Sequence, residues 1–250
     1  MPKPKVAIFD FACCEGCQLQ VVNLEEDILN LLTIVDVVEW REAMSEKSET
    51  YDVAIIEGSI TRPEDEEKLR KIRDKAKVLV ALGACAVNGG VNRLKNRIPL
   101  MEARRTVYGK DAEMPHLNTA LTKSVGEVVK VDYVVPGCPI DRTEFAHIVK
   151  SLAMGREPYV PSYAVCVECR IKENVCRWWK GEVCLGPLTR AGCQAACPSQ
   201  GAACVGCRGL AEDANPEGLA AALGQYGKSR ADMESKMDLF LKTFKEPTHA

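Results

Sequence analysis

The sequence predicts an α/β fold with a doubly wound parallel sheet, followed by a small cysteine-rich domain and a helical tail. Three observations lead to this prediction. Apolar runs alternate with helical patterns over residues 1–155, and eight of the thirteen cysteines lie between Cys166 and Cys207. A cysteine-free segment with helical periodicity follows them. We therefore expect three parts, which span residues 1–155, 156–210 and 211–250.

The first part contains five short and nearly continuous apolar runs, each of which we expect to form a strand. They cover residues 6–11, 34–38, 53–56, 78–82 and 133–135. Runs of this kind are typical of parallel strands that are buried on both faces of a sheet.

Helices are predicted between these strands from apolar side chains that recur every three or four residues. One stripe consists of Leu24, Ile28, Leu31 and Leu32, and a second of Leu69, Ile72 and Ala76. The second helix is opened by Thr61 and Pro63 and has acidic residues in its first turn, and a third helix covers residues 141–154. Strands and helices that alternate in this way predict a flavodoxin-like, doubly wound parallel sheet.

The two later parts are set apart by their composition. Residues 155–162 contain two prolines and no periodicity, which is typical of a linker. In the tail, apolar side chains at helical spacing predict a packing or docking face, formed by Met233, Met237, Phe240 and Phe244.

Composition and charge exclude several classes of partner. The 250 residues carry a net charge of −2 with both signs interspersed, which argues against binding to nucleic acid or to an anionic membrane surface. The longest apolar runs are too short for a membrane span, and we expect no export segment before the first strand. In a chain without an export segment, thirteen cysteines indicate metal binding rather than a framework of disulfides.

Four cysteines of the first part lie just after predicted strands. Cys14 and Cys17 follow the first strand, Cys85 follows the strand at residues 78–82, and Cys138 follows the last strand. The carboxyl ends of parallel strands meet at one edge of a sheet, so we expect these four thiols to converge. Thiolates from separate loops, with glycines beside them, favour a 4Fe–4S cluster over zinc, which compact knuckles usually bind.

The other eight cysteines form a dense series: Cys166, Cys169, Cys176, Cys184, Cys193, Cys197, Cys204 and Cys207. A zinc ribbon built from the two outer pairs would leave four interior cysteines without a role. Two clusters of four thiolates use all eight, and they would stabilise a segment that has few aliphatic residues. The spacing therefore predicts two further metal centres of the iron–sulfur type, with a non-redox zinc scaffold as an alternative.

Six motifs resemble the small subunit of nickel–iron (NiFe) hydrogenases. They are Cys14-Glu15-Gly16-Cys17, Glu57-Gly58-Ser59-Ile60, Gly83-Ala84-Cys85-Ala86, Pro136-Gly137-Cys138-Pro139, Cys184-Leu185-Gly186-Pro187 and Cys204-Val205-Gly206-Cys207. The likeness is greatest to the cytoplasmic, F420-non-reducing type, which works with heterodisulfide reductase. The resemblance implies that H2 is split at a nickel–iron centre on a separate large subunit. This chain would pass the electrons on to an acceptor subunit in the cytoplasm.

The resemblance also implies the ligands of three 4Fe–4S clusters. The proximal cluster would be held by Cys14, Cys17, Cys85 and Cys138, the medial cluster by Cys193, Cys197, Cys204 and Cys207, and the distal cluster by Cys166, Cys169, Cys176 and Cys184. Periplasmic relatives have a histidine as the first distal ligand, where this chain has Cys166. They have three medial cysteines, whereas a fourth thiol is present here.

Three further residues lie beside the proximal motif. Cys13 is left over, and we interpret it as a small buried residue. In the related quinone-reducing subunit of respiratory complex I, adjacent cysteines both bind the cluster, so a complex I-like subunit is the second candidate, although that relative lacks the later cysteine block. Glu15 and Glu57 either cap local structure or act at the subunit boundary or in proton movement.

Overall fold

The computed structural model describes residues 3–116 and 118–241, which include a sheet of five parallel strands. The strands are β1 (Lys5–Asp10), β2 (Asp36–Trp40), β3 (Val53–Glu57), β4 (Val78–Leu82) and β5 (Tyr133–Val135). They are arranged in the order β2-β1-β3-β4-β5, and every neighbouring pair is parallel. This is the flavodoxin-like order, so the predicted doubly wound sheet is confirmed.

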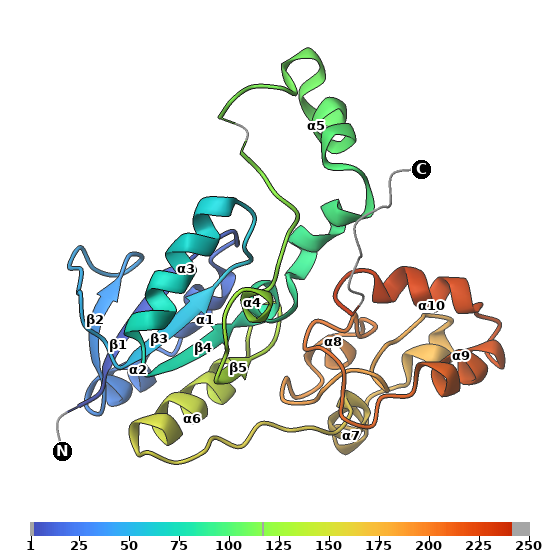
Figure 1. The fold of residues 1–250 in the computed structure, drawn as a ribbon. Helices are drawn as coiled ribbons and strands as arrows, with labels where there is room; N and C mark the ends of the chain where they lie inside the picture. Colours follow the sequence, from blue (N-terminus) through green and yellow to red (C-terminus); the bar gives the residue numbers. More distant parts are fainter. Residues whose placement is uncertain (1–2, 117, 242–250) are drawn as a thin grey trace.

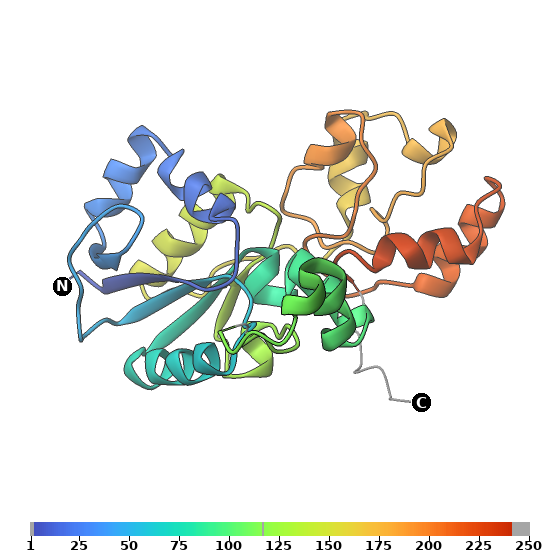
Figure 2. The ribbon, with the colours of Figure 1, turned by 90° about the horizontal axis from the view of Figure 1, so that it is seen from above.

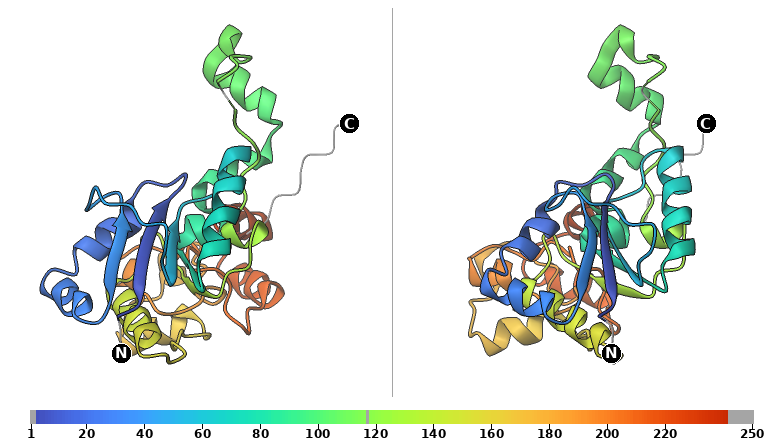
Figure 3. Two further views of the ribbon diagram at one scale, coloured as in Figure 1. Left: turned by 60° about the vertical axis from the view of Figure 1, so that its left-hand side comes forward. Right: turned by 90° about the vertical axis from the view of Figure 1, so that its left-hand side faces the viewer.

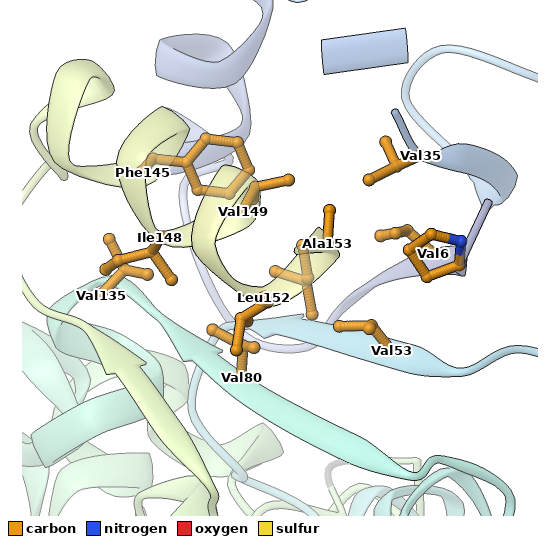
Figure 4. A pocket seen from close by; sticks show the side chains of 12 residues that line it. Val6, Val35, Val53, Val80, Val135, Phe145, Ile148, Val149, Leu152 and Ala153 are labelled. Carbon is orange, nitrogen blue, oxygen red and sulfur yellow. The ribbon is translucent and has the colours of Figure 1, made fainter. Parts of the chain in front are cut away.

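Helices cover both faces of the sheet (Figure 2). On one face, β1 directs Val6 and Ile8 toward α1 (Gly16–Val22), α2 (Glu26–Leu32) and α6 (Arg142–Ala153). On the other face, Ala7 and Phe9 pack toward α3 (Pro63–Lys75). Figure 4 shows the α6 layer, in which Phe145, Ile148 and Leu152 lie over the valines of the strands. Burial on both faces explains why the strands are continuous apolar runs.

The starts of two helices follow from local chemistry. Pro63 is at the first position of α3, with three acidic residues in the first turn that favour the positive end of the helix dipole. The residue before it is Arg62, so the helix begins after Arg62 rather than at Thr61. The carboxylate of Asp141 accepts a hydrogen bond from the Glu144 N–H at 2.9 Å and caps α6, within one residue of the predicted bounds.

Two predicted elements differ from the structure. The strand expected at residues 34–38 begins two residues later, because the turn that follows α2 uses Ile34 and Val35. The helix expected from the leucine stripe is α2, but it begins after Leu24, which lies in the turn between α1 and α2 where Glu25 has a positive φ of 54°. Leu24 and Leu31 are buried, whereas Leu32 is exposed.

An arm projects from the sheet between β4 and β5 (Figures 1 and 3). It follows α4 (Gly83–Asn88) and the 3-10 helix η1 (Gly90–Arg97), and it carries α5 (Leu100–Tyr108) and η2 (Gly109–Asp111), before the chain returns through η3 (Val125–Glu127). None of the side chains of α5 is buried. The base of the arm is fixed by Asn96, which donates to the Thr122 carbonyl and accepts from the Thr122 N–H, both at 2.9 Å.

The cysteine-rich segment lies beside the carboxyl edge of the sheet (Figure 1). Residues 155–162 form no helix or strand and lead to α7 (Val165–Ile171), η4 (Arg177–Lys180), α8 (Ala196–Ser199), α9 (Pro216–Gly224) and α10 (Arg230–Met237). A small apolar cluster joins this segment to the tail: Leu185, Leu188, Leu219, Leu223, Met233 and Met237. The predicted stripe thus packs through Met233 and Met237, and Phe244 lies outside the described residues.

Candidate metal centres

The four thiols expected after the strands form one group, which we call the proximal group. Cys14 lies between β1 and α1, Cys17 lies in the first turn of α1, Cys85 in α4, and Cys138 after β5. Burial raises the pKa of Cys85 to about 12, and the neighbouring Cys138 and Cys14 raise it further. The pKa of Cys17 is raised mainly by burial, and Cys85 also contributes. The carboxyl edge of the sheet therefore brings the four cysteines together.

Two glycines leave room for these sulfurs. Gly83 has a φ of 79°, and a Cβ atom there would overlap the Cys17 Sγ. Gly90 has a φ of 55°, and its Cβ would lie 2.7 Å from the Cys85 Sγ. A side chain at either position would both strain the backbone and displace a thiol of the proximal group.

A buried carboxylate holds the start of α1. Glu57, at the end of β3, is 2% exposed, and it accepts hydrogen bonds from the N–H groups of Cys17 at 3.0 Å and Gln18 at 3.3 Å. The Gln18 side chain in turn donates to Glu15 and accepts from the Trp40 indole at 2.7 Å. Glu15 is partly exposed, and burial is the main cause that raises its pKa. The two acids are thus connected through Gln18.

Cys13 faces these acids. Its Sγ and one carboxylate oxygen each of Glu15 and Glu57 lie within 4.8 Å of one another. The thiol donates to the Phe11 carbonyl at 3.3 Å, and burial is the main cause that raises its pKa. The charges of Glu57 and Glu15 raise the pKa of this thiol further.

A second group lies at the far end of the cysteine-rich segment, and we call it the distal group. It consists of Cys166, Cys169, Cys176 and Cys184, which line a cavity of about 780 Å³. Burial raises the pKa of Cys166 to about 12, and the three other thiols raise it further. A Cβ at Gly186 would lie 3.2 Å from the Cys166 Sγ and 3.6 Å from the Cys184 Sγ. The backbone at Gly186 therefore lies close to two sulfurs of the distal group.

The remaining four cysteines form a medial group, Cys193, Cys197, Cys204 and Cys207. Burial raises the pKa of Cys207 to about 11. A hydrogen bond with the backbone of Cys138 lowers this pKa, whereas the nearby thiols of Cys193, Cys138 and Cys197 raise it further. Burial also raises the pKa of Cys204 to about 12, while the Thr189 hydroxyl lowers it. The Glu168 carboxylate fixes the loop beside Cys193, because it accepts from the Gly192 N–H at 2.8 Å and the Ala195 N–H at 3.0 Å.

Contacts between the three thiol groups show the order in which they lie. Cys207 of the medial group lies beside Cys138 of the proximal group. At the other side, the Cys204 N–H donates to the Cys184 Sγ of the distal group at 3.2 Å. The medial group therefore lies between the other two. Cys166 and Cys169 lie with Cys176 and Cys184, so the described geometry does not pair them with Cys204 and Cys207 as a zinc ribbon would require.

The donor set fits iron–sulfur clusters. All twelve ligand candidates are free thiols, and burial raises the pKa of Cys85, Cys166 and Cys204, which keeps these three thiols protonated near neutral pH. A cluster replaces those protons with iron, which stabilises the thiolates without further charged groups from the protein. Twelve sulfurs in three groups of four match the tetrathiolate coordination of 4Fe–4S clusters.

Known proteins are similar to this chain over most of its length. Residues 14–152 match the family model described as NADH ubiquinone oxidoreductase, 20 kDa subunit, which is more than half of the chain. Sulfhydrogenase 2 subunit delta of Pyrococcus furiosus is 38% identical, over 86% of this chain and 90% of that protein. This chain belongs to the family of hydrogenase small subunits and the complex I 20 kDa subunit.

Within that family the hydrogenase relatives extend past the region shared with complex I. A subunit of the F420-non-reducing hydrogenase of Methanococcus voltae is 33% identical to this small subunit, over 95% of this chain and 94% of that protein. The small subunit is part of an oxidoreductase whose catalytic site lies on the large subunit.

Solved structures agree with the fold of the small subunit. A chain of an NAD⁺-reducing NiFe hydrogenase in the H2-reduced state aligns with a TM-score of 0.58 and 30% identity, over 64% of this chain and 96% of that chain. A NiFeSe hydrogenase from Desulfomicrobium baculatum aligns with a TM-score of 0.55 over 97% of this chain and 100% of that chain. At 15% identity the second shows the fold alone. Within residues 3–116 and 118–241, no helix has both the length and the apolar character that a membrane crossing needs.

Two buried polar residues were missed by the sequence analysis. Gln18 follows the second cysteine of the first motif, and Arg208 follows the last cysteine of the second part. Both are 2% exposed and make several hydrogen bonds. Their position directly after a C-x-x-C pair is the only signal in the sequence, and it does not distinguish a buried side chain from one on the surface.

Proposed function

We propose that this small subunit carries electrons from H2 oxidation at the large subunit, through three 4Fe–4S clusters, to an acceptor subunit. An acceptor that serves heterodisulfide reductase fits the resemblance to the F420-non-reducing hydrogenases. The observation that carries the proposal is the order of the three thiol groups, in which Cys138 lies beside Cys207 and Cys204 bonds to Cys184. A continuous series of sites of this kind is what stepwise electron transfer requires.

The proposed ligands are those of the three groups. The proximal cluster is bound by Cys14, Cys17, Cys85 and Cys138, the medial by Cys193, Cys197, Cys204 and Cys207, and the distal by Cys166, Cys169, Cys176 and Cys184. When bound, a 4Fe–4S cluster supplies one-electron redox chemistry. The chain contributes burial, backbone N–H groups near sulfur and nearby charge, which are the properties that set the potential.

Two surfaces fit the proposed partners. Cys14 and Cys138 of the proximal group are exposed, so a cluster bound there lies at the surface until the large subunit covers it. Beside the distal group, Ile171 is 76% exposed and Trp179 is 71% exposed. Exposed apolar side chains next to a redox site suit the docking of an acceptor subunit. A cytoplasmic location is supported by thirteen cysteines that form no disulfide.

Metal analysis of the complex, purified without oxygen and resolved by subunit, tests the proposal. We expect about 12 iron atoms per copy of this chain, four for each of three clusters, and nickel on a larger chain that copurifies. Zinc without iron would contradict the iron–sulfur assignment and favour a non-redox scaffold.

A complex I-like cluster subunit is the second candidate. It is favoured by the family match, which covers residues 14–152 and ends before the cysteine-rich segment. A subunit of that kind would use the proximal group alone, so the same analysis would find about four iron atoms per chain and no nickel. The relatives that match over nearly the whole length are hydrogenase subunits, which is why we place this candidate second.

Glu57 provides a further prediction. We expect Glu57→Gln to slow H2 oxidation and change its pH profile while the iron content stays the same, because an amide cannot take up and release a proton as a carboxylate does. The amide oxygen can still accept the Cys17 N–H, so the ligand remains in place. The measurement is H2-dependent dye reduction at a series of pH values on both sides of neutrality.

Asp65→Asn is the matched control for Glu57→Gln. Asp65 is also buried and lies in the first turn of α3, but its carboxylate pairs with Arg62 rather than with the backbone of a cysteine. An unchanged pH profile in the Glu57 variant would refute a role in proton movement and leave only the hydrogen bonds at the start of α1.

A further inference from the structure

An arginine is buried at the junction between the proximal and medial groups. The side chain of Arg208, next to Cys207, is 1% exposed. Its Nη1 donates to the Pro136 carbonyl at 2.7 Å, and its Nε donates to the carbonyl of Ala191 at 2.8 Å and of Arg190 at 3.2 Å. The guanidinium therefore binds the backbone two residues before Cys138 and also two residues before Cys193.

The charge of Arg208 is balanced by Glu144 of α6. Both carboxylate oxygens of Glu144 accept hydrogen bonds from the guanidinium: Oε1 from Nη2 at 2.6 Å and Oε2 from Nη1 at 2.8 Å. The Glu144 side chain is 7% exposed. Gly192 has a φ of 114°, and a Cβ there would overlap the guanidinium. The backbone beside Cys193 thus approaches the pair closely because it has no side chain at this position.

The pair joins parts of the chain that each lead to a proposed ligand. Glu144 belongs to the helix that follows Cys138, Pro136 belongs to the loop that precedes it, and Arg208 and Ala191 belong to the medial segment. A bidentate arginine has a fixed fork of donors, so it holds its acceptors at set positions in a way that a lysine does not. Among the described ion pairs, no other has both side chains less than 8% exposed.

We propose that the Arg208–Glu144 pair fixes the position of the medial thiols relative to the proximal thiols, and thereby the separation of the two clusters. The inference rests on the proposed function, because it presumes clusters at both groups. Electron transfer between two centres falls steeply as their separation grows, so a rigid junction here keeps the step fast. Arg208 and Glu144 are positioning residues, because they contact loops that carry ligands.

The charges of the pair also matter. Glu144 compensates the cation, so the junction adds little net charge beside either cluster. If Glu144 is replaced by glutamine, the arginine stays buried without its counter-ion, and a nearby positive charge favours the reduced cluster. Arg208→Lys keeps the positive charge but loses the rigid, bidentate set of hydrogen-bond donors of the guanidinium. The two variants therefore separate geometry from charge.

The experiment uses the complex with its clusters, reduced by H2, and compares iron content, potentials and magnetic coupling. For Arg208→Lys we expect unchanged iron content and a smaller splitting of the electron paramagnetic resonance signal that arises from coupling between the proximal and medial clusters. For Glu144→Gln we expect the midpoint potentials of both clusters to shift upward. Arg73→Lys is the control, because Arg73 pairs with Asp132 at 3.0 Å across the sheet domain and contacts no cysteine loop.

Two results would overturn the inference. In the first, both variants keep their full iron content, the signal splitting of Arg208→Lys is unchanged, and the midpoint potentials of Glu144→Gln are unchanged. The other is loss of iron from both variants but not from Arg73→Lys, which would assign the pair to folding of the cysteine-rich segment. If the unaltered complex contains only about four iron atoms per chain, the proposed function fails instead, and this result is seen before any variant is made.

Discussion

Cys85→Ser is expected to abolish H2-driven electron flow through the complex. Cys85 lies in α4, directly after β4, and its thiol is close to Cys14 and Cys138 of the proximal group. The serine oxygen is a harder and shorter ligand than a thiolate, and the irons of a 4Fe–4S cluster are bound mainly by thiolates. Cys13 is the remaining thiol of the sheet domain, and because it faces Glu15 and Glu57 we do not expect it to substitute for Cys85.

The measurement is H2-dependent reduction of an artificial electron acceptor, with iron counted on the same sample. The variant should contain about four iron atoms fewer than the unaltered chain, and the medial and distal clusters should keep their spectra. Cys13→Ser is the matched control, and we expect it to retain both iron and activity. Full activity of Cys85→Ser would remove Cys85 from the proximal ligands. Loss of iron in Cys13→Ser would favour the adjacent-cysteine arrangement of complex I.

Removal of iron is expected to unfold the cysteine-rich segment and leave the sheet domain folded. The sheet has two apolar clusters of its own, one on each face. By contrast, residues 163–210 share one apolar cluster with the tail, and only Leu185 and Leu188 of its buried members belong to this segment. The helices α7 and α8 of the segment have only seven and four residues. Helices so short are not stable alone, so metal binding supplies much of the folding free energy.

Hydrogen exchange before and after anaerobic chelation measures this difference. Amides of β1, β3 and β4 should stay protected and act as the internal control, while amides of residues 163–210 should exchange rapidly. Retained protection across 163–210 in iron-free protein would mean that Leu185, Leu188 and the tail suffice to hold the segment, contrary to our expectation.

Much of the fold could be predicted because it depends on local patterns. Continuous apolar runs such as Val78–Leu82 identify strands buried on both faces, and the capping acid Asp141 marks the start of α6. The proximal thiols could be placed because strand ends of a parallel sheet converge. The turn at Leu24 and Glu25 before α2 could not be predicted, because a glutamate does not by its residue type signal a positive φ.

The site was predicted less completely, for a physical reason. Motif spacing identifies cysteines that bind a common centre, but it carries no information on which side chains meet across the fold. Arg208 and Glu144 are 64 residues apart, and each is an ordinary charged residue in its own stretch of sequence. Gln18 is likewise recognised as a link between Glu15 and Glu57 only once the chain is folded.

The packing of the tail on the cysteine-rich segment has a consequence for how the protein is made. Leu185 and Leu188 are covered by Leu219, Leu223 and Met233, which the ribosome adds after the last cysteine. Domains fold as they emerge, from the N-terminus onward, so the sheet domain can form while the rest is still being synthesised. The apolar cover of Leu185 and Leu188 is complete only when α9 and α10 have emerged. A chain truncated before residue 216 would therefore leave Leu185 and Leu188 of the cysteine-rich segment without the packing that α9 and α10 provide.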